Sequence, residues 1–244
     1  QNQVKIESAK ASSFVEREFL CWVHQLIFRG EESFYKKQIQ NPKVAMGNIT
    51  SDGTIANMTA LTMAIAKAFP PDNRGFKGIH SEGLVRALDH YGYRQALIFV
   101  SRRGHYSICK AGSILGIGDQ AVIRVPVQPW INKIDVARLR SLIDGIRKED
   151  RAVGKPSKFI ALVGIAGTTE TGNIDDLDAL AEVAEEIGAH FHVDAAWGGG
   201  ALLMEGARDM MRGIEKADSV TIDGHKLLYA PNSMGICVFK NVCD

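Results

Sequence analysis

Apolar residues in this chain recur in two patterns, one at helical spacing and one in short continuous runs. Residues 14–28 and the Ala-, Leu- and Met-rich stretch 55–69 are typical of amphipathic helices. The pair Pro70 and Pro71 ends the second helix, because proline lacks a backbone N–H and its ring clashes with the preceding turn. Beyond it, helix-like and strand-like segments alternate. We expect helices at 82–91, 106–115, 136–147 and 177–187, and strands at 96–101, 121–125, 159–165, 190–194, 219–222 and 234–239.

Such alternation predicts an α/β fold, a mainly parallel sheet flanked by helices on both faces. Ligands of such sheets bind at the carboxyl ends of the strands. The charged stretch 147–158 is interpreted as a solvated connection. With 244 residues, no internal repeat and no linker, the chain is expected to form a single large domain over residues 1–244.

Composition narrows the classes of partner. The chain is 45% hydrophobic and 23% charged, and 29 basic against 28 acidic residues give a net charge of +1. Nucleic acid and anionic membrane surfaces are therefore not expected as partners, and a small molecule is. The apolar run 159–166 is far shorter than the roughly 20 residues of a membrane span. The four cysteines are scattered without zinc spacing, which favours reduced thiols in the cytoplasm and predicts no metal site.

Two polar residues at strand ends are candidates for chemistry. Asp194 ends an apolar strand, where a carboxylate needs a cationic partner such as a protonated pyridine nitrogen, although a helix N-cap explains it equally well. Lys226 follows the strand at 219–222, and a partly desolvated lysine there is able to attack an aldehyde and form a Schiff base. A solvated surface lysine is the alternative reading.

Two further features fit a flat, phosphorylated ligand. His105 follows a strand and is placed to stack on a ring, although a histidine with a purely structural role fits the same position. The turn 50–54 precedes a helix, and its free N–H groups and helix dipole suit a phosphate. Ordinary N-capping accounts for the same residues.

Four motifs in order resemble group II pyridoxal-phosphate-dependent amino-acid decarboxylases: GHYS at 104–107, GTTETGNID at 167–175, HVDAAWGG at 192–199 and SVTIDGHK at 219–226. The resemblance extends over about residues 14–240 and is nearest to the bacterial branch of aspartate 1-decarboxylases, often labelled glutamate decarboxylase-like. It implies the large domain of the fold type I, or PLP-dependent transferase-like, class.

The resemblance also implies a cofactor, pyridoxal 5'-phosphate, and roles for named residues. Lys226 would carry the cofactor as a Schiff base and Asp194 would pair with its pyridine nitrogen, while His105 and Ala196 would pack on opposite ring faces. Thr169 would lie near the ring substituents. The phosphate would be held by the residues at the start of the helix and by the histidine before the lysine, namely Asp52, Gly53, Thr54 and His225.

The implied reaction is decarboxylation of an acidic L-amino acid, first L-aspartate to β-alanine and second L-glutamate to γ-aminobutyrate, in a homodimer. Transamination, carbon–carbon lyase chemistry or a non-catalytic cofactor-binding fragment are the alternatives.

The sequence departs from the family pattern at two positions before the lysine. Asp223 stands where many relatives have Asn, and its carboxylate would repel a phosphate unless it is paired. Gly224 stands where relatives commonly have Pro or Ala, which loosens the turn. The family's N-terminal segment and small C-terminal domain are expected to be absent. Arg102 and Arg103 are only guesses for a substrate contact.

Overall fold

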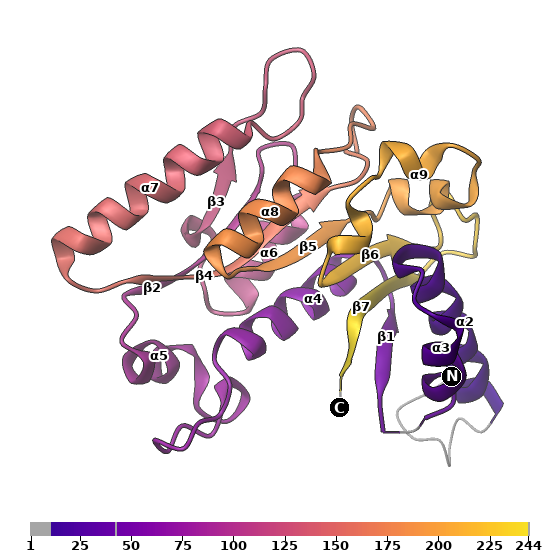
Figure 1. The fold of residues 1–244 in the computed structure, drawn as a ribbon, viewed down its shortest axis with the longest axis horizontal. Coiled ribbons are helices and arrows are strands. Elements are labelled where there is room, and N and C mark those ends of the chain that lie inside the picture. The colour runs from indigo at the N-terminus through magenta and orange to yellow at the C-terminus, as the bar shows by residue number, and fades with distance from the viewer. Residues whose placement is uncertain (1–10, 42, 244) are drawn as a thin grey trace.

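A mixed sheet of seven strands forms the centre of the computed structural model, which describes residues 11–41 and 43–243 (Figure 1). The strand order is β1-β7-β6-β5-β4-β2-β3. Pairing is parallel from β3 through β6 and antiparallel where β7 meets β6 and β1. The strands are β1 Ala45–Thr50, β2 Gln95–Ser101, β3 Val122–Val125, β4 Ser157–Ile165, β5 His190–Asp194, β6 Ser219–Asp223 and β7 Gly235–Cys243. The predicted α/β fold with a mainly parallel sheet is confirmed.

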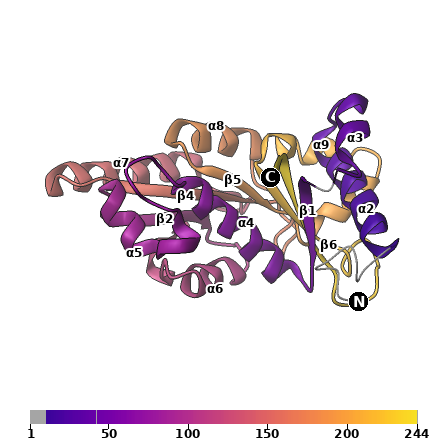
Figure 2. The same ribbon diagram turned by 90° about the horizontal axis from the view of Figure 1, so that it is seen from below.

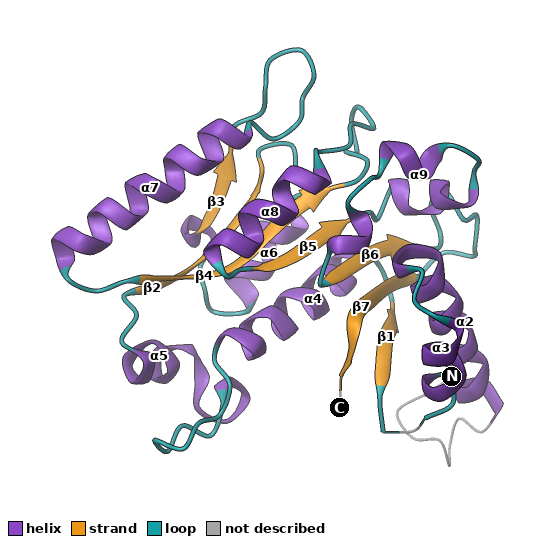
Figure 3. Ribbon diagram, in the orientation of Figure 1, coloured by secondary structure: helices purple, strands orange, loops and turns teal. Residues whose placement is uncertain are grey.

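Helices cover both faces of the sheet, α7 and α8 on one side and α4, α5 and α6 on the other (Figure 2). Figure 3 shows the same layers by secondary structure. The α-helices are α2 Ala11–Phe28, α3 Glu32–Gln38, α4 Gly53–Ala68, α5 Ile79–Tyr91, α6 Ser107–Ile114, α7 Val136–Val153, α8 Leu177–Ile187 and α9 Ala207–Met210. Short 3-10 helices are η1 Asp119–Ala121, η2 Gly198–Leu203 and η3 Ile214–Lys216.

Each face of the sheet has its own apolar core. Leu180 and Val183 of α8 pack with Phe191 of β5 on one side, and Leu61 of α4 packs with Ile98 of β2 on the other. Strands β2 and β4 are covered on both faces and are buried along most of their length, so each contains a continuous run of apolar residues in the sequence. In the described part of the chain, no helix is long and apolar enough to cross a bilayer.

The stretch 147–158 is not the solvated connection that we predicted. Helix α7 continues to Val153 and ends at Gly154, which adopts the left-handed conformation. Asp150 on this helix is buried and accepts hydrogen bonds from the backbone N–H of Ser157 at 2.8 Å and from Nε of Arg94 at 2.7 Å. Charged residues on the solvent side of the last turns conceal the helical period in the sequence.

Helix α3 and strand β1 have no counterpart in the sequence prediction, and neither do α9, η2 and η3. β1 pairs antiparallel with β7 and contains Gly47, where a Cβ atom would lie 2.3 Å from the backbone oxygen of Cys237. Only glycine fits such a close approach of two backbones. Because glycine also weakens a strand signal, the six residues of β1 are not recognisable as a strand from their pattern.

Candidate active site

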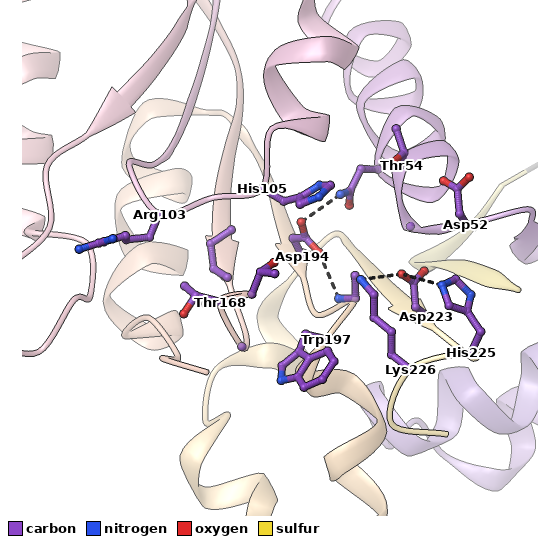
Figure 4. A pocket seen from close by; sticks show the side chains of 16 residues that line it. Asp52, Thr54, Arg103, His105, Thr168, Asp194, Trp197, Asp223, His225 and Lys226 are labelled. Atoms are coloured by element: carbon purple, nitrogen blue, oxygen red, sulfur yellow. Dashed lines mark hydrogen bonds and ion pairs between the residues drawn. The ribbon is translucent and has the colours of Figure 1, made fainter. Parts of the chain in front are cut away.

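A pocket lies where the carboxyl ends of the parallel strands meet the first turn of α4 (Figure 4). Its lining combines residues from the segments that follow β2, β4, β5 and β6. All nine site residues predicted from the sequence line it, namely Asp52, Gly53, Thr54, His105, Thr169, Asp194, Ala196, His225 and Lys226. The structure thus brings together residues up to 174 positions apart, the difference between 226 and 52.

The N-terminus of α4 forms one wall of the pocket. Asp52 is the N-cap, and its Oδ1 accepts the backbone N–H of Ile55 at 3.0 Å, which lowers the pKa of Asp52. A Cβ atom at Gly53 would lie 2.8 Å from both carboxylate oxygens of Asp223, so the wall requires glycine here. The positive end of the helix dipole faces this position, and an anionic group is favoured beside it.

Asp194 ends β5 inside the pocket and is only 5% exposed. Its Oδ2 accepts a hydrogen bond from Nδ2 of Asn57 at 3.0 Å, and its Oδ1 accepts the backbone N–H of Ala196 at 3.1 Å. Among the described residues it has no ion-pair partner within 4.0 Å. A buried carboxylate held by neutral donors calls for a cationic ligand in the pocket.

Lys226 and Asp223 form an ion pair at the same end of the sheet. Nζ of Lys226 lies 2.8 Å from Oδ2 of Asp223, whose side chain is 3% exposed. Nε2 of His225 is 3.8 Å from the same oxygen, while Oδ1 of Asp223 is buried with no hydrogen-bond partner among the described residues. The negative charge of Asp223 is therefore paired, which removes the objection that it would repel an anion.

The remaining predicted residues lie around the same pocket. His105 follows β2, and its Nδ1 accepts the N–H of Ser107 at 3.3 Å. Ala196 is buried in the turn after β5, and Thr169 is exposed at the pocket rim. Arg103 also lines the pocket, but its guanidinium points away from Lys226 and Asp194 and donates to Oδ1 of Asn132 at 3.3 Å (Figure 4).

Sequence reasoning missed two pocket residues of chemical interest, Asn57 and Trp197. Asn57 is a fully buried amide on α4, one helical turn after Gly53. A polar residue on the face that also carries Ala56, Ala60 and Leu61 was the available signal. Trp197 lies in the motif HVDAAWGG at 192–199, but nothing in the sequence predicts that its ring lines the pocket.

The model of the pyridoxal-dependent decarboxylase conserved domain matches residues 1–244. The chain belongs to this family. It is 46% identical over 241 residues to an aspartate 1-decarboxylase of Aliivibrio fischeri, a match that covers 99% of this chain and 43% of that protein. It is 34% identical to an L-2,4-diaminobutyrate decarboxylase of Rhizobium meliloti, over 83% of this chain and 35% of that one. The family resemblance read from the sequence is confirmed.

A solved structure has the same fold, the glutamate decarboxylase domain of a diaminobutyrate-pyruvate transaminase and L-2,4-diaminobutyrate decarboxylase from Vibrio parahaemolyticus. Its TM-score is 0.79 at 28% identity, covering 99% of this chain and 47% of that one. The chain thus spans less than half the length of these relatives.

Family membership implies pyridoxal 5'-phosphate as the cofactor, and the pocket fits it. The buried Asp194 supplies an anion for a protonated pyridine nitrogen, Lys226 supplies an amine for an aldehyde, and the first turn of α4 supplies N–H groups for a phosphate. In the described residues, no cluster of three or more histidine, cysteine or acidic side chains is arranged to hold a metal ion.

Proposed function

We propose that this chain carries the cofactor site of a pyridoxal-phosphate-dependent decarboxylase that acts on an acidic L-amino acid, with L-aspartate giving β-alanine as the first candidate and L-glutamate as the second. The observation that carries the proposal is Asp194, a buried carboxylate in the same pocket as Lys226 that has no ionic partner among the described residues. The substrate assignment is supported by the relative at 46% identity, which is named an aspartate 1-decarboxylase.

Asp194 has the role of holding a proton on the pyridine nitrogen of the bound cofactor. When bound, the cofactor supplies an electron sink for the electron pair that remains on Cα as the carboxylate leaves. The carboxylate of Asp194 is held by two hydrogen bonds, so it would favour the protonated ring nitrogen without reorganisation, and the cationic ring would stabilise the electron pair. Lys226 would hold the cofactor through its Nζ, which lies 2.8 Å from Oδ2 of Asp223 in this structure.

The other predicted residues orient the ring and its phosphate. We propose that His105 packs on one face and Ala196 on the other, with Thr169 beside the ring substituents. The phosphate then lies against the start of α4, where Gly53 and Thr54 offer backbone N–H groups, and near His225 (Figure 4). Asp52 contributes as the N-cap that orients this turn.

We also propose a homodimer. Large apolar side chains are exposed on the segments that flank the pocket, and burial against a second copy would remove them from water. They are Trp197, Leu203, Met204 and Tyr229. The free thiols of Cys21 and Cys109 support a reducing compartment, for which we propose the cytoplasm.

The cofactor assignment is tested by reduction of the complex with borohydride and peptide mapping. We expect an absorption band from bound pyridoxal 5'-phosphate and label on Lys226, and loss of both in Lys226→Ala. Lys67→Ala is the matched control, because Lys67 pairs with Asp218 outside the pocket. Label spread over surface lysines, equal in the wild type and Lys226→Ala, would contradict the assignment.

The reaction is tested by release of carbon dioxide and identification of the amine product. We expect turnover of L-aspartate above L-glutamate and L-2,4-diaminobutyrate, and a loss of orders of magnitude in Asp194→Ala with the fold intact. A keto acid without carbon dioxide would indicate transamination instead. If the chain binds the cofactor but turns over none of these amino acids, the decarboxylase activity is contradicted and only the cofactor site is supported.

A further inference from the structure

One face of β5 and β6 carries a polar stripe although both strands are buried. Polar residues alternate there with apolar ones, so that they share the face covered by α4. The polar stripe consists of His190, His192 and Asp194 on β5 and of Ser219, Thr221 and Asp223 on β6, all of them buried.

A network of hydrogen bonds extends along this stripe away from Asp194. Nδ2 of Asn57 donates to Oδ2 of Asp194 at 3.0 Å and to Oγ of Ser107 at 3.1 Å, and Oδ1 of Asn57 lies 3.0 Å from Nε2 of His192. Nδ1 of His192 lies 2.8 Å from Oγ of Ser219. Oγ of Ser219 in turn lies 2.7 Å from Nε2 of His190. The network thus links the pocket with the opposite end of the sheet.

The amide of Asn57 sets the direction of the hydrogen bonds in this network, although Nδ1 of His192 also lies 3.2 Å from the backbone oxygen of Ser219. Because the amide of Asn57 donates to a carboxylate, its oxygen must accept, and His192 therefore carries its proton on Nε2. Nδ1 of His192 then accepts from the hydroxyl of Ser219, which leaves the serine oxygen to accept from Nε2–H of His190.

This arrangement leaves Nδ1 of His190 without a proton. That atom is buried with no hydrogen-bond partner among the described residues, and Oδ2 of Asp218 is 3.9 Å away, too far for a hydrogen bond. Burial lowers the pKa of both His190 and His192 to about 4, so both rings are neutral at neutral pH. All the donors therefore point toward Asp194.

We infer that Asn57, oriented by His192, is a positioning residue that holds the carboxylate of Asp194 in place, facing the pocket. The inference rests on the proposed function, since it assigns Asn57 a role in holding Asp194 against the pyridine nitrogen. Aligned donors stabilise an anion, and without Asn57 both Oδ2 of Asp194 and Nε2–H of His192 lose a hydrogen-bond partner although both side chains are buried.

The first test needs no cofactor. Long-range ¹H–¹⁵N spectra of the chain labelled in histidine report which ring nitrogen carries the proton. We expect the Nε2–H tautomer for His190 and His192 at neutral pH, and a mixture of tautomers at His192 in Asn57→Ala, which removes its acceptor. An Nδ1–H tautomer at His192 in the wild type would reverse the donor-to-acceptor direction of the hydrogen bonds at this ring and overturn the inference.

The second test measures cofactor affinity and the spectrum of the bound cofactor. Asn57→Ala is expected to weaken affinity roughly 10- to 100-fold, the range for one hydrogen bond to a charged group. The absorption of the bound cofactor should also change its pH dependence, because a less stabilised carboxylate holds the ring proton less firmly. Thr62→Ala is the matched control on α4, since it removes a hydrogen bond to the backbone oxygen of Met58 outside the network.

The outcomes separate this inference from the proposed function. Failure of the wild-type chain to bind the cofactor would contradict the proposed function. The tautomer measurement would still decide the donor-to-acceptor direction of the hydrogen bonds between His190 and Asp194. Wild-type binding with an unchanged affinity and spectrum in folded Asn57→Ala overturns the inference alone. If Asn57→Ala does not fold, the tautomers of the wild type remain the deciding measurement.

Discussion

His190 is predicted to make the fold sensitive to acid. Its ring is buried at the start of β5, and burial lowers its pKa to about 4 against an ordinary value of 6.5, with Asp218 opposing the shift. A histidine whose pKa is depressed by folding binds its proton more readily in the unfolded chain. Its contribution to stability is present above pH 6.5 and is lost as the pH falls from 6.5 to 4.

The size of the effect follows from the two pKa values. At pH 5 the unfolded histidine is almost fully protonated and the folded one is almost fully neutral, so the wild type loses about 2 kcal/mol of unfolding free energy relative to pH 8 through His190 alone. Asp175 acts in the opposite direction, because burial raises its pKa to about 6. Its contribution is common to wild type and variant and cancels in their difference.

The assay is urea unfolding of the wild type and His190→Gln at pH 8 and at pH 5. Glutamine keeps a donor for Ser219 and does not titrate, so the variant should lose about 2 kcal/mol less than the wild type between the two pH values. His80→Gln, a change of an exposed histidine on α5, is the matched control. Equal losses in wild type and His190→Gln would refute the reasoning.

Two further changes test the pocket wall and the end of α7. Gly53→Ala should lower cofactor affinity at least tenfold in a binding titration, because the added methyl group meets the carboxylate of Asp223 and must displace it or the helix turn. Asp150→Ala should lower the unfolding free energy by about 3 kcal/mol in urea, since it removes the acceptor of the N–H of Ser157 and one of the two carboxylates that pair with Arg94. An unchanged affinity in the first variant, or a loss below 0.5 kcal/mol in the second, would contradict these accounts.

Much of the fold was predictable because strands covered on both faces are read as unbroken apolar runs. β4 is the clearest example, with every residue from Phe159 to Ile165 buried. The edge strand β1 was not predictable, since its identity depends on the close contact of Gly47 with β7. The end of α7 was missed because residues 147–153 are mostly charged, and burial of Asp150 is decided by Arg94 from a distant segment.

The site was predictable to the extent that chemistry follows strand ends. Asp194 and Lys226 each lie at the end of an apolar strand, and parallel strands end at the same edge of a sheet. The positions of the strands alone therefore predict that both residues lie in one pocket. Asn57 could not be assigned in this way. Its partners His192 and Asp194 are 135 and 137 residues away in the sequence, and only the packing of α4 across the sheet brings them together.

The sequence nevertheless carries a trace of the network in the alternation of β5 and β6. His190 and His192 are polar positions in a central strand that is buried on both faces, where an unpaired polar group costs about 1–3 kcal/mol. Such positions are compatible with stability only if each group is hydrogen-bonded or serves a ligand. In this chain Nε2 of His190 and both ring nitrogens of His192 belong to a series of hydrogen bonds that ends at Asp194, which accounts for the polar character of these two positions.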